Sequence, residues 1–286
     1  MLENSILDLV YIFFFIIVMF LLISQFRNNH VPTDFDVLLK ETERHPNPYL
    51  KSQHNEILPD PVTRYLQITH SKPINRPSYV EVQFSGYQRL RPESNLLPVK
   101  GKNYYTLARP GYISYSRFTW LSLIWIDIKQ RYSINDGYMQ GRIYSIIPVL
   151  SMIGLRLSKL CLARYISDAV WFPWVFEPTT NLDWEPEDDQ TAIIRVSYHP
   201  LITRFRVRFN RENQIETISS LGQYVGHDGT VIPYERVVSY CDYQQIQGIS
   251  IPMKMRVVWR CPEEERIVQD LKIISIQYHF APFAKK

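Results

Sequence analysis

A two-residue hydrophobic period begins at residue 79 and recurs along the chain as far as residue 280. Val80, Val82 and Phe84 alternate with polar residues, which is the pattern of a strand that buries one face. Most connections are short and contain Gly, Pro, Asn or Asp, as hairpin turns do. Consecutive strands with short connections predict an antiparallel meander, and so large a sheet is expected to curl. The alternating runs are residues 79–85, 101–109, 112–118, 121–133, 138–146, 191–198, 203–210, 214–224, 234–243, 249–260 and 267–280.

Three stretches have helical spacing instead. Residues 34–44 form one, which is either a tether or a surface helix, and residues 60–66 form a second, with Asp60 as its N-cap. Residues 148–171 form the third, which ends before Pro173 and is expected to pack across the sheet. The expected fold is mainly β, of the α+β class: a large curved antiparallel sheet or half-barrel with a few packed helices.

An apolar segment precedes these elements, starting at Ile6 and ending at Ile23, with Asp8 as its one charged residue. Its uninterrupted part has 15 residues, and the whole segment reaches the roughly 17 residues that are needed to cross a bilayer. A cleaved secretory signal is the alternative, but no Lys or Arg precedes the segment and no small-residue cleavage site follows it. The expected organisation is a transmembrane anchor at residues 1–26, a tether with a short helix at 27–57 and a β-rich globular domain at 58–286.

The basic residues near this segment lie after it. Arg27, Lys40 and Arg44 follow the segment, whereas Glu3 and Asp8 are the charged residues at its start. Cytoplasmic flanks of membrane helices carry an excess of Lys and Arg. The chain is therefore expected to be a single-pass membrane protein whose large domain lies on the cytoplasmic side.

Charge, cysteine and histidine usage argue against several kinds of site. The net charge of +4 is too small to indicate nucleic-acid binding, and no aromatic and basic RNA-binding signature is present. Cys161, Cys241 and Cys261 have no C-x-x-C spacing, so neither zinc nor dithiol chemistry is indicated, and all three are expected to be small buried residues. A disulfide between Cys241 and Cys261 would form if neighbouring strands brought them together. The seven scattered histidines do not support a metal site, and no cofactor is expected.

The motifs of the common enzyme classes are missing from the sequence. It contains no G-x-S-x-G nucleophile elbow, no phosphate-binding loop, no G-x-G-x-x-G after a strand and no H-E-x-x-H. Asp127 and Asp136 would form a carboxylate pair if they converged, but two acids at turn-like positions are common. Whether the chain is an enzyme stays open at this point.

One predicted strand carries three arginines on a single face. Arg204, Arg206 and Arg208 alternate with apolar residues, so a strand directs their guanidinium groups to the same side. One interpretation is a docking site for an anionic headgroup or a carboxylate. The other is a solvated sheet face, the usual complement of a buried inner face. The arginines would then pair with Glu212, Glu216 or the acidic residues 185–189.

The most distinctive segment is RYISDAVWFP, residues 164–173, in which Arg164 and Asp168 lie four positions apart on a predicted helix. It resembles the Arg-Tyr-Leu-Ala-Glu, Trp, Pro motif of a bacterial family known only as a domain of unknown function, with Asp168 in place of the usual glutamate. Many members of this family have Pro-Trp where this chain has Tyr234-Glu235. Further similar motifs are LPDPVTRYL at residues 58–66, DGYM at 136–139, and Ile251-Pro252 with Trp259.

The resemblance covers residues 58–280 and implies a shape rather than an activity. The shape is a curved antiparallel sheet with helices against its concave side, similar to periplasmic lipoprotein carriers. Such a half-barrel often leaves an apolar groove. The tryptophans that would either line such a groove or form plain core are Trp120, Trp125, Trp171 and Trp174.

The leading hypothesis is a membrane-anchored, non-enzymatic module that binds a hydrophobic or lipid-like molecule. Its partners would be the lipid bilayer, through Ile6 to Ile23, and a hydrophobic small molecule whose polar end the charged residues hold. Its candidate ligand-binding residues are Arg164, Tyr165, Asp168, Trp171, Arg204, Arg206 and Arg208.

Two other classes of function remain open. One is an enzyme that acts on a membrane-soluble substrate, with Arg164, Tyr165, Asp168 or Asp136 near the reacting centre. The other is a scaffold or assembly factor whose exposed sheet edge binds a membrane protein.

Overall fold

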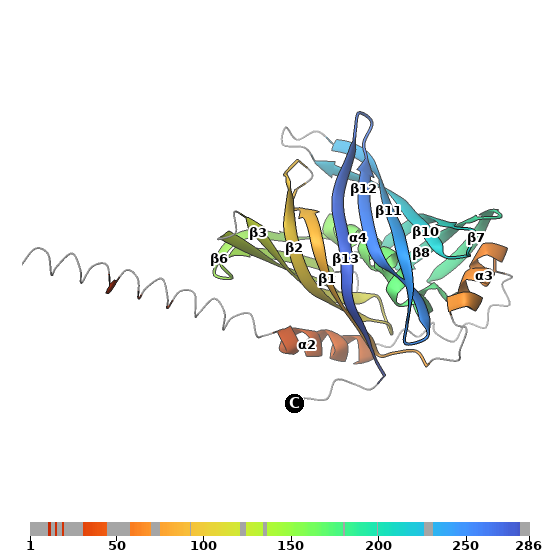
Figure 1. Ribbon diagram of the computed structural model, residues 1–286, viewed down its shortest axis with the longest axis horizontal. Helices are drawn as coiled ribbons and strands as arrows, with labels where there is room; N and C mark the ends of the chain where they lie inside the picture. The colour runs from red at the N-terminus through yellow and green to blue at the C-terminus, as the bar shows by residue number, and fades with distance from the viewer. Residues whose placement is uncertain are drawn as a thin grey trace, which may run out of the picture.

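The folded part of the chain is built around one antiparallel sheet (Figure 1). The computed structural model describes residues 31–44, 58–69, 75–91, 93–120, 124–133, 136–179, 181–198, 200–225 and 231–280, together with residues 11, 12, 15 and 19. Within these residues the sheet has 13 strands, in the order β6-β5-β4-β3-β2-β1-β13-β12-β11-β10-β9-β8-β7. The strands are β1 (Tyr79–Arg89), β2 (Leu96–Thr106), β3 (Gly111–Trp120), β4 (Ile124–Ser133), β5 (Asp136–Ile143), β6 (Ile147–Ile153), β7 (Leu182–Asp188), β8 (Thr191–Tyr198), β9 (Leu201–Phe209), β10 (Ile215–Val225), β11 (Val231–Ile246), β12 (Ile249–Arg260) and β13 (Glu265–His279).

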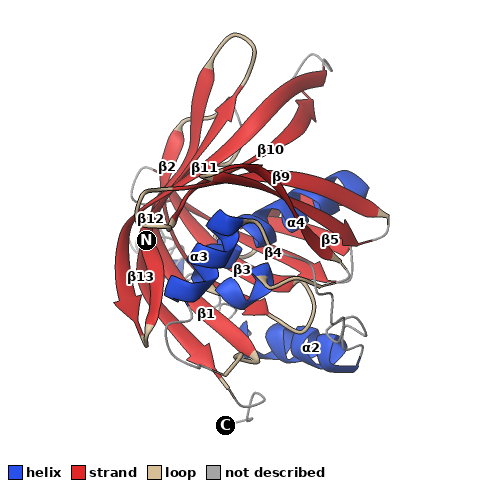
Figure 2. Cartoon of the chain, turned by 90° about the vertical axis from the view of Figure 1, so that its right-hand side faces the viewer, coloured by secondary structure: helices blue, strands red, loops and turns tan. Residues whose placement is uncertain are grey.

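Two meanders meet at one long-range pairing. Strands β1 to β6 pair in succession, as do strands β7 to β13. The first and last strands, β1 and β13, then pair with each other, with Tyr79 opposite His279. Figure 2 shows the resulting sheet curling around the helices α3 (Asp60–Thr69) and α4 (Leu155–Asp168). The predicted curved antiparallel sheet is confirmed.

The helix α4 lies against the inner face of the sheet and continues into two short 3-10 helices, Ala169–Trp171 and Pro173–Phe176. The segment formed by these 3-10 helices is hydrogen-bonded to two strands of the sheet, β12 and β13. The Trp171 Nε1–H donates to the Pro252 carbonyl at 3.1 Å, and the Tyr278 hydroxyl donates to the Trp171 carbonyl at 2.7 Å. Phe172 packs between Tyr105 and Tyr165 in the same core, with its ring centroid 4.7 Å from that of Tyr105. Each such side chain contributes about 1.5–3 kcal/mol through burial.

The helix α2 (Val31–Arg44) packs on the opposite, outer face of the sheet. Phe35 is completely buried, and its ring centroid lies 5.0 Å from those of both Tyr79 and Tyr104. Neighbouring residues of a strand point to opposite faces, so Tyr104 meets α2 while Tyr105 meets the segment after α4. Of the two interpretations of this helix, the structure therefore shows the surface helix.

The prediction of one long helix over residues 148–171 was wrong over residues 148–154. Residues Ile147–Ile153 form the edge strand β6, and the helix begins only at Leu155. Gly154 separates the two elements with a φ of +107°, in a region that side chains rarely adopt. The strand β7 was also missed, because its acidic residues resemble a loop, although Leu182 and Trp184 are buried.

The alternative of a disulfide between Cys241 and Cys261 is not realised, since Cys161, Cys241 and Cys261 are all free. Cys241 lies within β11 opposite Lys254, whereas Cys261 follows the end of β12. Cys161 is buried in α4, as expected of a small apolar residue, but Cys241 is exposed.

The apolar segment from Ile6 to Ile23 lies outside the described residues, apart from positions 11, 12, 15 and 19. In the described parts of the chain, no helix has the length and apolar character needed to cross a membrane. The transmembrane anchor thus stays a prediction.

Candidate functional site

Arg164 is the centre of a polar network between α4 and the inner face of the sheet. Its guanidinium group lies over the Tyr112 ring at 5.1 Å and donates to side chains from α4 and three neighbouring strands. Such a network ties the helix to the sheet and satisfies polar groups that burial would otherwise leave without partners. The acceptors are Asp168 Oδ2 at 3.2 Å, Gln130 Oε1 at 2.6 Å, Asn103 Oδ1 at 3.1 Å and Ser114 Oγ at 3.1 Å.

The Asp168 carboxylate is almost completely enclosed. Its side chain is 2% exposed, and it accepts hydrogen bonds from the Tyr105 hydroxyl at 2.7 Å and from Arg164. Burial raises the pKa of Asp168, whereas the neighbouring Arg164 charge and the Tyr105 hydrogen bond act in the opposite direction. Because this network has few free hydrogen-bonding atoms, its geometry suits positioning of α4 better than contact with a ligand.

The other two candidate residues in this segment belong to the core. Tyr165 is buried and donates its hydroxyl hydrogen to the Thr106 carbonyl at 2.8 Å. Trp171 and Trp174 are buried as well, while Trp120 is about half exposed. The structure therefore brings Arg164, Tyr165, Asp168 and Trp171 together in one packed region, away from the three arginines of β9.

Arg204, Arg206 and Arg208 lie on the outer face of the sheet, and each pairs with a glutamate. The pairs are Arg204 with Glu185 at 3.1 Å, Arg206 with Glu187 at 2.7 Å and Arg208 with Glu216 at 3.2 Å.

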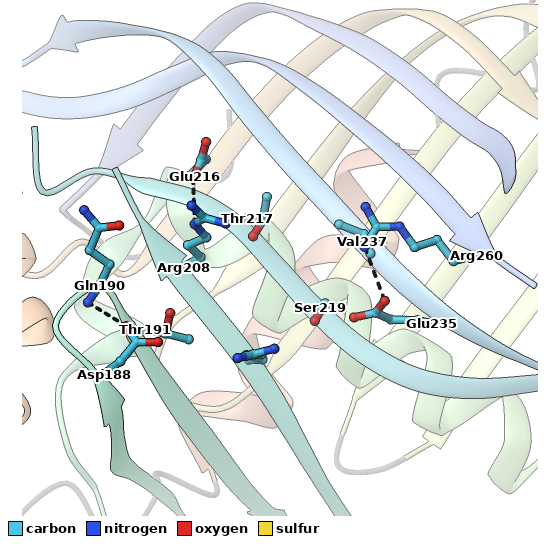
Figure 3. Close-up of a pocket in the computed structure, with 11 residues that line it drawn as sticks. Asp188, Gln190, Thr191, Arg208, Glu216, Thr217, Ser219, Glu235, Val237 and Arg260 are labelled. Atoms are coloured by element: carbon cyan, nitrogen blue, oxygen red, sulfur yellow. Dashed lines mark hydrogen bonds and ion pairs between the residues drawn. The ribbon is translucent and has the colours of Figure 1, made fainter. Parts of the chain in front are cut away.

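Two of these arginines, Arg206 and Arg208, line a polar hollow of about 470 Å³. Figure 3 shows the Arg208–Glu216 and Arg260–Glu235 pairs within it. These contacts agree with the solvated-face interpretation, and a docking role for the arginines stays a prediction.

A larger and more apolar groove lies between α4 and the ends of β9, β10 and β11. Its volume is about 1010 Å³, and it opens to solvent. Ile202 and Leu221 are among its most exposed apolar side chains, at 66% and 86%. The residues lining the groove are Leu155, Arg156, Lys159, Leu160, Leu162, Ala163, Leu201, Ile202, Thr203, Ser220, Leu221, Gly222, Pro233, Tyr234, Glu235, Arg236, Arg260, Cys261 and Pro262.

One wall of the groove is an aromatic stack fitted onto a glycine. The Tyr234 ring lies 4.1 Å from the Trp259 ring at an interplanar angle of 13°. On β10, a Cβ atom added to Gly222 would come within 2.5 Å of Tyr234 Cζ. Only a residue without a side chain therefore allows Tyr234 to lie flat across the neighbouring strand.

Arg236 supplies a cation to the same wall. It is 9% exposed, and its Nη1 donates to Ser167 Oγ at 2.6 Å. Burial lowers the pKa of Arg236, and its neighbour Asp168 acts in the opposite direction. Sequence reasoning missed this residue, although the signal was present: Arg236 falls on the inward-facing side of β11, between Tyr234 and Val238, where an apolar residue is the rule.

Across the described residues, no group of three or more His, Cys, Asp or Glu side chains is placed to hold a metal ion. Asp127 does not pair with Asp136 but with Arg117, at 2.7 Å.

Comparisons with known proteins identify a family whose function is unknown. No curated protein matches the chain. The solved structures that it resembles include a DUF1329 family protein from Desulfovibrio piger, at 11% identity, with a TM-score of 0.39 and coverage of 78% of this chain and 94% of that one. A LolA superfamily protein from Nitrosomonas europaea is similar at 9% identity, with a TM-score of 0.39 and coverage of 78% and 93%. The family of unknown function DUF6544 matches residues 49–270, most of the chain, and the chain belongs to this family.

Proposed function

We propose that the chain is a non-enzymatic module that binds a hydrophobic or lipid-like molecule in the groove beside α4, and that its N-terminal apolar segment holds it at a membrane. The observation that carries this proposal is the groove itself. Its volume of about 1010 Å³ is at the upper end of the range of about 300–1,000 Å³ that is typical of small-molecule sites.

The chemistry of the lining favours a ligand with hydrocarbon parts. Leu155, Leu160, Ile202 and Leu221 each expose a third or more of their surface in or around the groove. Exposed apolar side chains that line one groove mark a binding site more often than isolated exposed residues do. A ligand that covers it would gain about 25 cal/mol for each Å² of apolar surface removed from water.

The anchor would place this groove close to a bilayer. The support for it is the apolar segment from Ile6 to Ile23 together with the basic residues that follow it. In this arrangement the domain lies on the cytoplasmic side. The full chain is then expected to stay in the membrane fraction during carbonate extraction, and protease is expected to digest its large domain in inverted membrane vesicles. Extraction of the full chain by carbonate would contradict the anchor.

An enzyme is less well supported by the groove. Among its described lining residues the carboxylate is that of Glu235, which pairs with Arg260 at 3.4 Å. Cys261 is the thiol of the lining, but no histidine that would activate it lines the groove in the described part of the chain. Asp168, whose pKa is raised, lies behind the lining and is bonded to Arg164 and Tyr105.

The test is native mass spectrometry of the gently extracted full-length protein, followed by organic extraction. A discrete bound hydrophobic molecule is the expected result. Ala163→Phe fills the groove and should lower its occupancy, whereas the matched variant Thr217→Phe fills the polar hollow on the outer face and should leave it unchanged. A protein without bound molecule in all three forms, or with a bound protein partner instead, would favour the scaffold function.

A further inference from the structure

The buried charges beside the groove do not balance. Arg236 is buried, and Asp168 is the one buried carboxylate among the residues that the structure describes. That carboxylate already pairs with Arg164 at 3.2 Å, while Arg236 donates to the neutral Ser167 hydroxyl. Two guanidinium groups thus face one carboxylate, and one positive charge at the wall of the groove lacks a compensating anion. A buried charge without such compensation is costly.

The rest of the lining adds to this positive charge. Arg156 and Lys159 lie on the exposed side of α4 and form no ion pair with any described residue. Arg260, in contrast, is engaged with Glu235 at 3.4 Å and Glu265 at 2.8 Å. The groove therefore combines apolar walls with cations and has one paired acid among its described lining residues.

We propose that the groove takes an anionic amphiphile, with its carboxylate or phosphate on Arg236 and its acyl chain along the apolar walls. This inference rests on the proposed function and adds the chemical class of the ligand. Hydrogen bonds between a guanidinium and an oxyanion are roughly twice as strong as neutral ones. Binding would also give Arg236 the counter-charge that the folded chain does not supply, and Arg156 and Lys159 would strengthen the attraction at the rim.

The experiment uses the full-length protein in phosphatidylcholine nanodiscs and two photoactivatable probes of equal chain length, a fatty acid and the corresponding fatty alcohol. Cross-linked peptides are identified by mass spectrometry. The fatty acid should label groove peptides about ten times more strongly than the alcohol, which corresponds to about 1.4 kcal/mol. Competition by lysophosphatidic acid then distinguishes a phosphate from a carboxylate as the preferred head.

Variants assign the effect to Arg236. Arg236→Met should reduce labelling by the acid to the level of the alcohol, and Arg236→Lys should retain part of the difference. The matched control Arg256→Met removes an exposed arginine of β12 that pairs with Asp270, and should change nothing. Thermal unfolding of each variant shows that it is folded. The comparison of acid with alcohol in the wild-type protein does not depend on any variant.

Two failures have different meanings. Equal labelling of the groove by acid and alcohol, unaffected by Arg236→Met, would overturn the anionic ligand and leave the binding module intact. Absence of groove labelling by either probe would overturn the proposed function itself.

A second observation, independent of the groove, concerns the edge strand β6. Ile147 and Met152 are 49% and 43% exposed on one side of this strand, and Ile153 is 77% exposed on the other, because a β-bulge at Val149 shifts the alternation between them. The surrounding sequence contains no Asp or Glu between Asp136 and Asp168. A long apolar edge that is open to water promotes aggregation unless something covers it.

We infer that β6 and the first turn of α4 contact the surface of an anionic membrane. Side chains on both faces of β6 are exposed, so a protein that docked against one face would leave the other in water, whereas a strand that inserts at the membrane surface is covered by lipid on both faces. Arg156 and Lys159 follow directly and would meet anionic headgroups. Leu155 belongs both to this corner and to the lining of the groove, which would then open at the membrane.

An environment-sensitive dye on a single cysteine tests this contact in the full-length protein in nanodiscs, with Cys241 and Cys261 replaced by serine. A dye at Met152→Cys should shift to the blue and be quenched by lipids with spin-labelled chains, more strongly with anionic lipid. The matched position Ile274→Cys, an exposed apolar residue of β13, should stay in water. Equal behaviour at both positions, or a shift that depends on protein concentration alone, would overturn the inference.

Discussion

Replacing Arg164 by methionine removes the charge at the centre of the polar network and keeps a side chain of similar length. Asp168 would remain as a carboxylate that is 2% exposed, with the Tyr105 hydroxyl at 2.7 Å as its direct donor. Removal of one partner from a buried ion pair costs about 3–5 kcal/mol. We expect the lower end, about 3 kcal/mol, because burial already raises the pKa of Asp168 and the carboxyl group can take up a proton instead.

The loss is measured from thermal unfolding of the full-length protein, followed by the fluorescence of buried tryptophans such as Trp171. For a chain of this size a loss of 3 kcal/mol lowers the Tm by roughly 6–12 °C. Asp168→Asn alone leaves Arg164 with neutral acceptors. The double variant should therefore be less destabilised than the sum of the two single variants by about 1 kcal/mol or more.

The matched control is Arg204→Met, which breaks an exposed ion pair with Glu185 and should change stability by less than about 1 kcal/mol. A stability of Arg164→Met within about 1 kcal/mol of the wild type, or additive effects at positions 164 and 168, would refute the central role of this ion pair.

Three further predictions follow from individual contacts. The raised pKa of Asp168 means that the folded protein holds this proton more tightly than the unfolded chain, so its contribution to stability is complete below a pH of about 3.9 and is lost as the pH rises through the raised pKa. Thermal unfolding measured across this pH range should show that the stability of Asp168→Asn depends less on pH than that of the wild type. An unchanged dependence would contradict the raised pKa of Asp168. Gly222→Ala should displace the Tyr234 ring into the groove, which should cost about 1–3 kcal/mol of stability, lower the Tm and reduce fatty-acid labelling. Wild-type values of the Tm and of the labelling would show that Tyr234 moves aside without cost. Phe35→Ala empties a fully buried site under α2 and should cost about 3–5 kcal/mol locally, seen as faster hydrogen exchange in α2 with unchanged exchange in α4. Unchanged exchange in α2 would mean that other contacts hold this helix.

Hydrophobic period predicted the strands where one face is buried and the other is not. The prediction for β8 and β12 agrees with the structure at both ends, and in β1 the alternating residues Val80, Val82 and Phe84 are buried. The same reasoning failed at β6, because an edge strand with apolar residues exposed on both sides has no two-residue period to detect. It failed at β7 because acidic residues there serve as partners for the arginines of β9.

Local backbone geometry is what the sequence by itself determined. A strand places alternate residues on one face, so Arg204, Arg206 and Arg208 had to share a side, and a helix brings Arg164 within reach of Asp168 four positions later. These relations hold whatever the rest of the chain does, because they depend on the period of each element alone.

Only the tertiary structure decided what surrounds each of these groups. The pairing of β1 with β13 joins the two meanders, and the groove gathers residues of α4, β9, β10 and β11 that are far apart in the chain. The tertiary packing also encloses Arg164 and Asp168 in one network and places Arg236, which no motif marked, at the wall of the groove. Contacts between distant segments depend on how whole faces pack, and no local period carries that information.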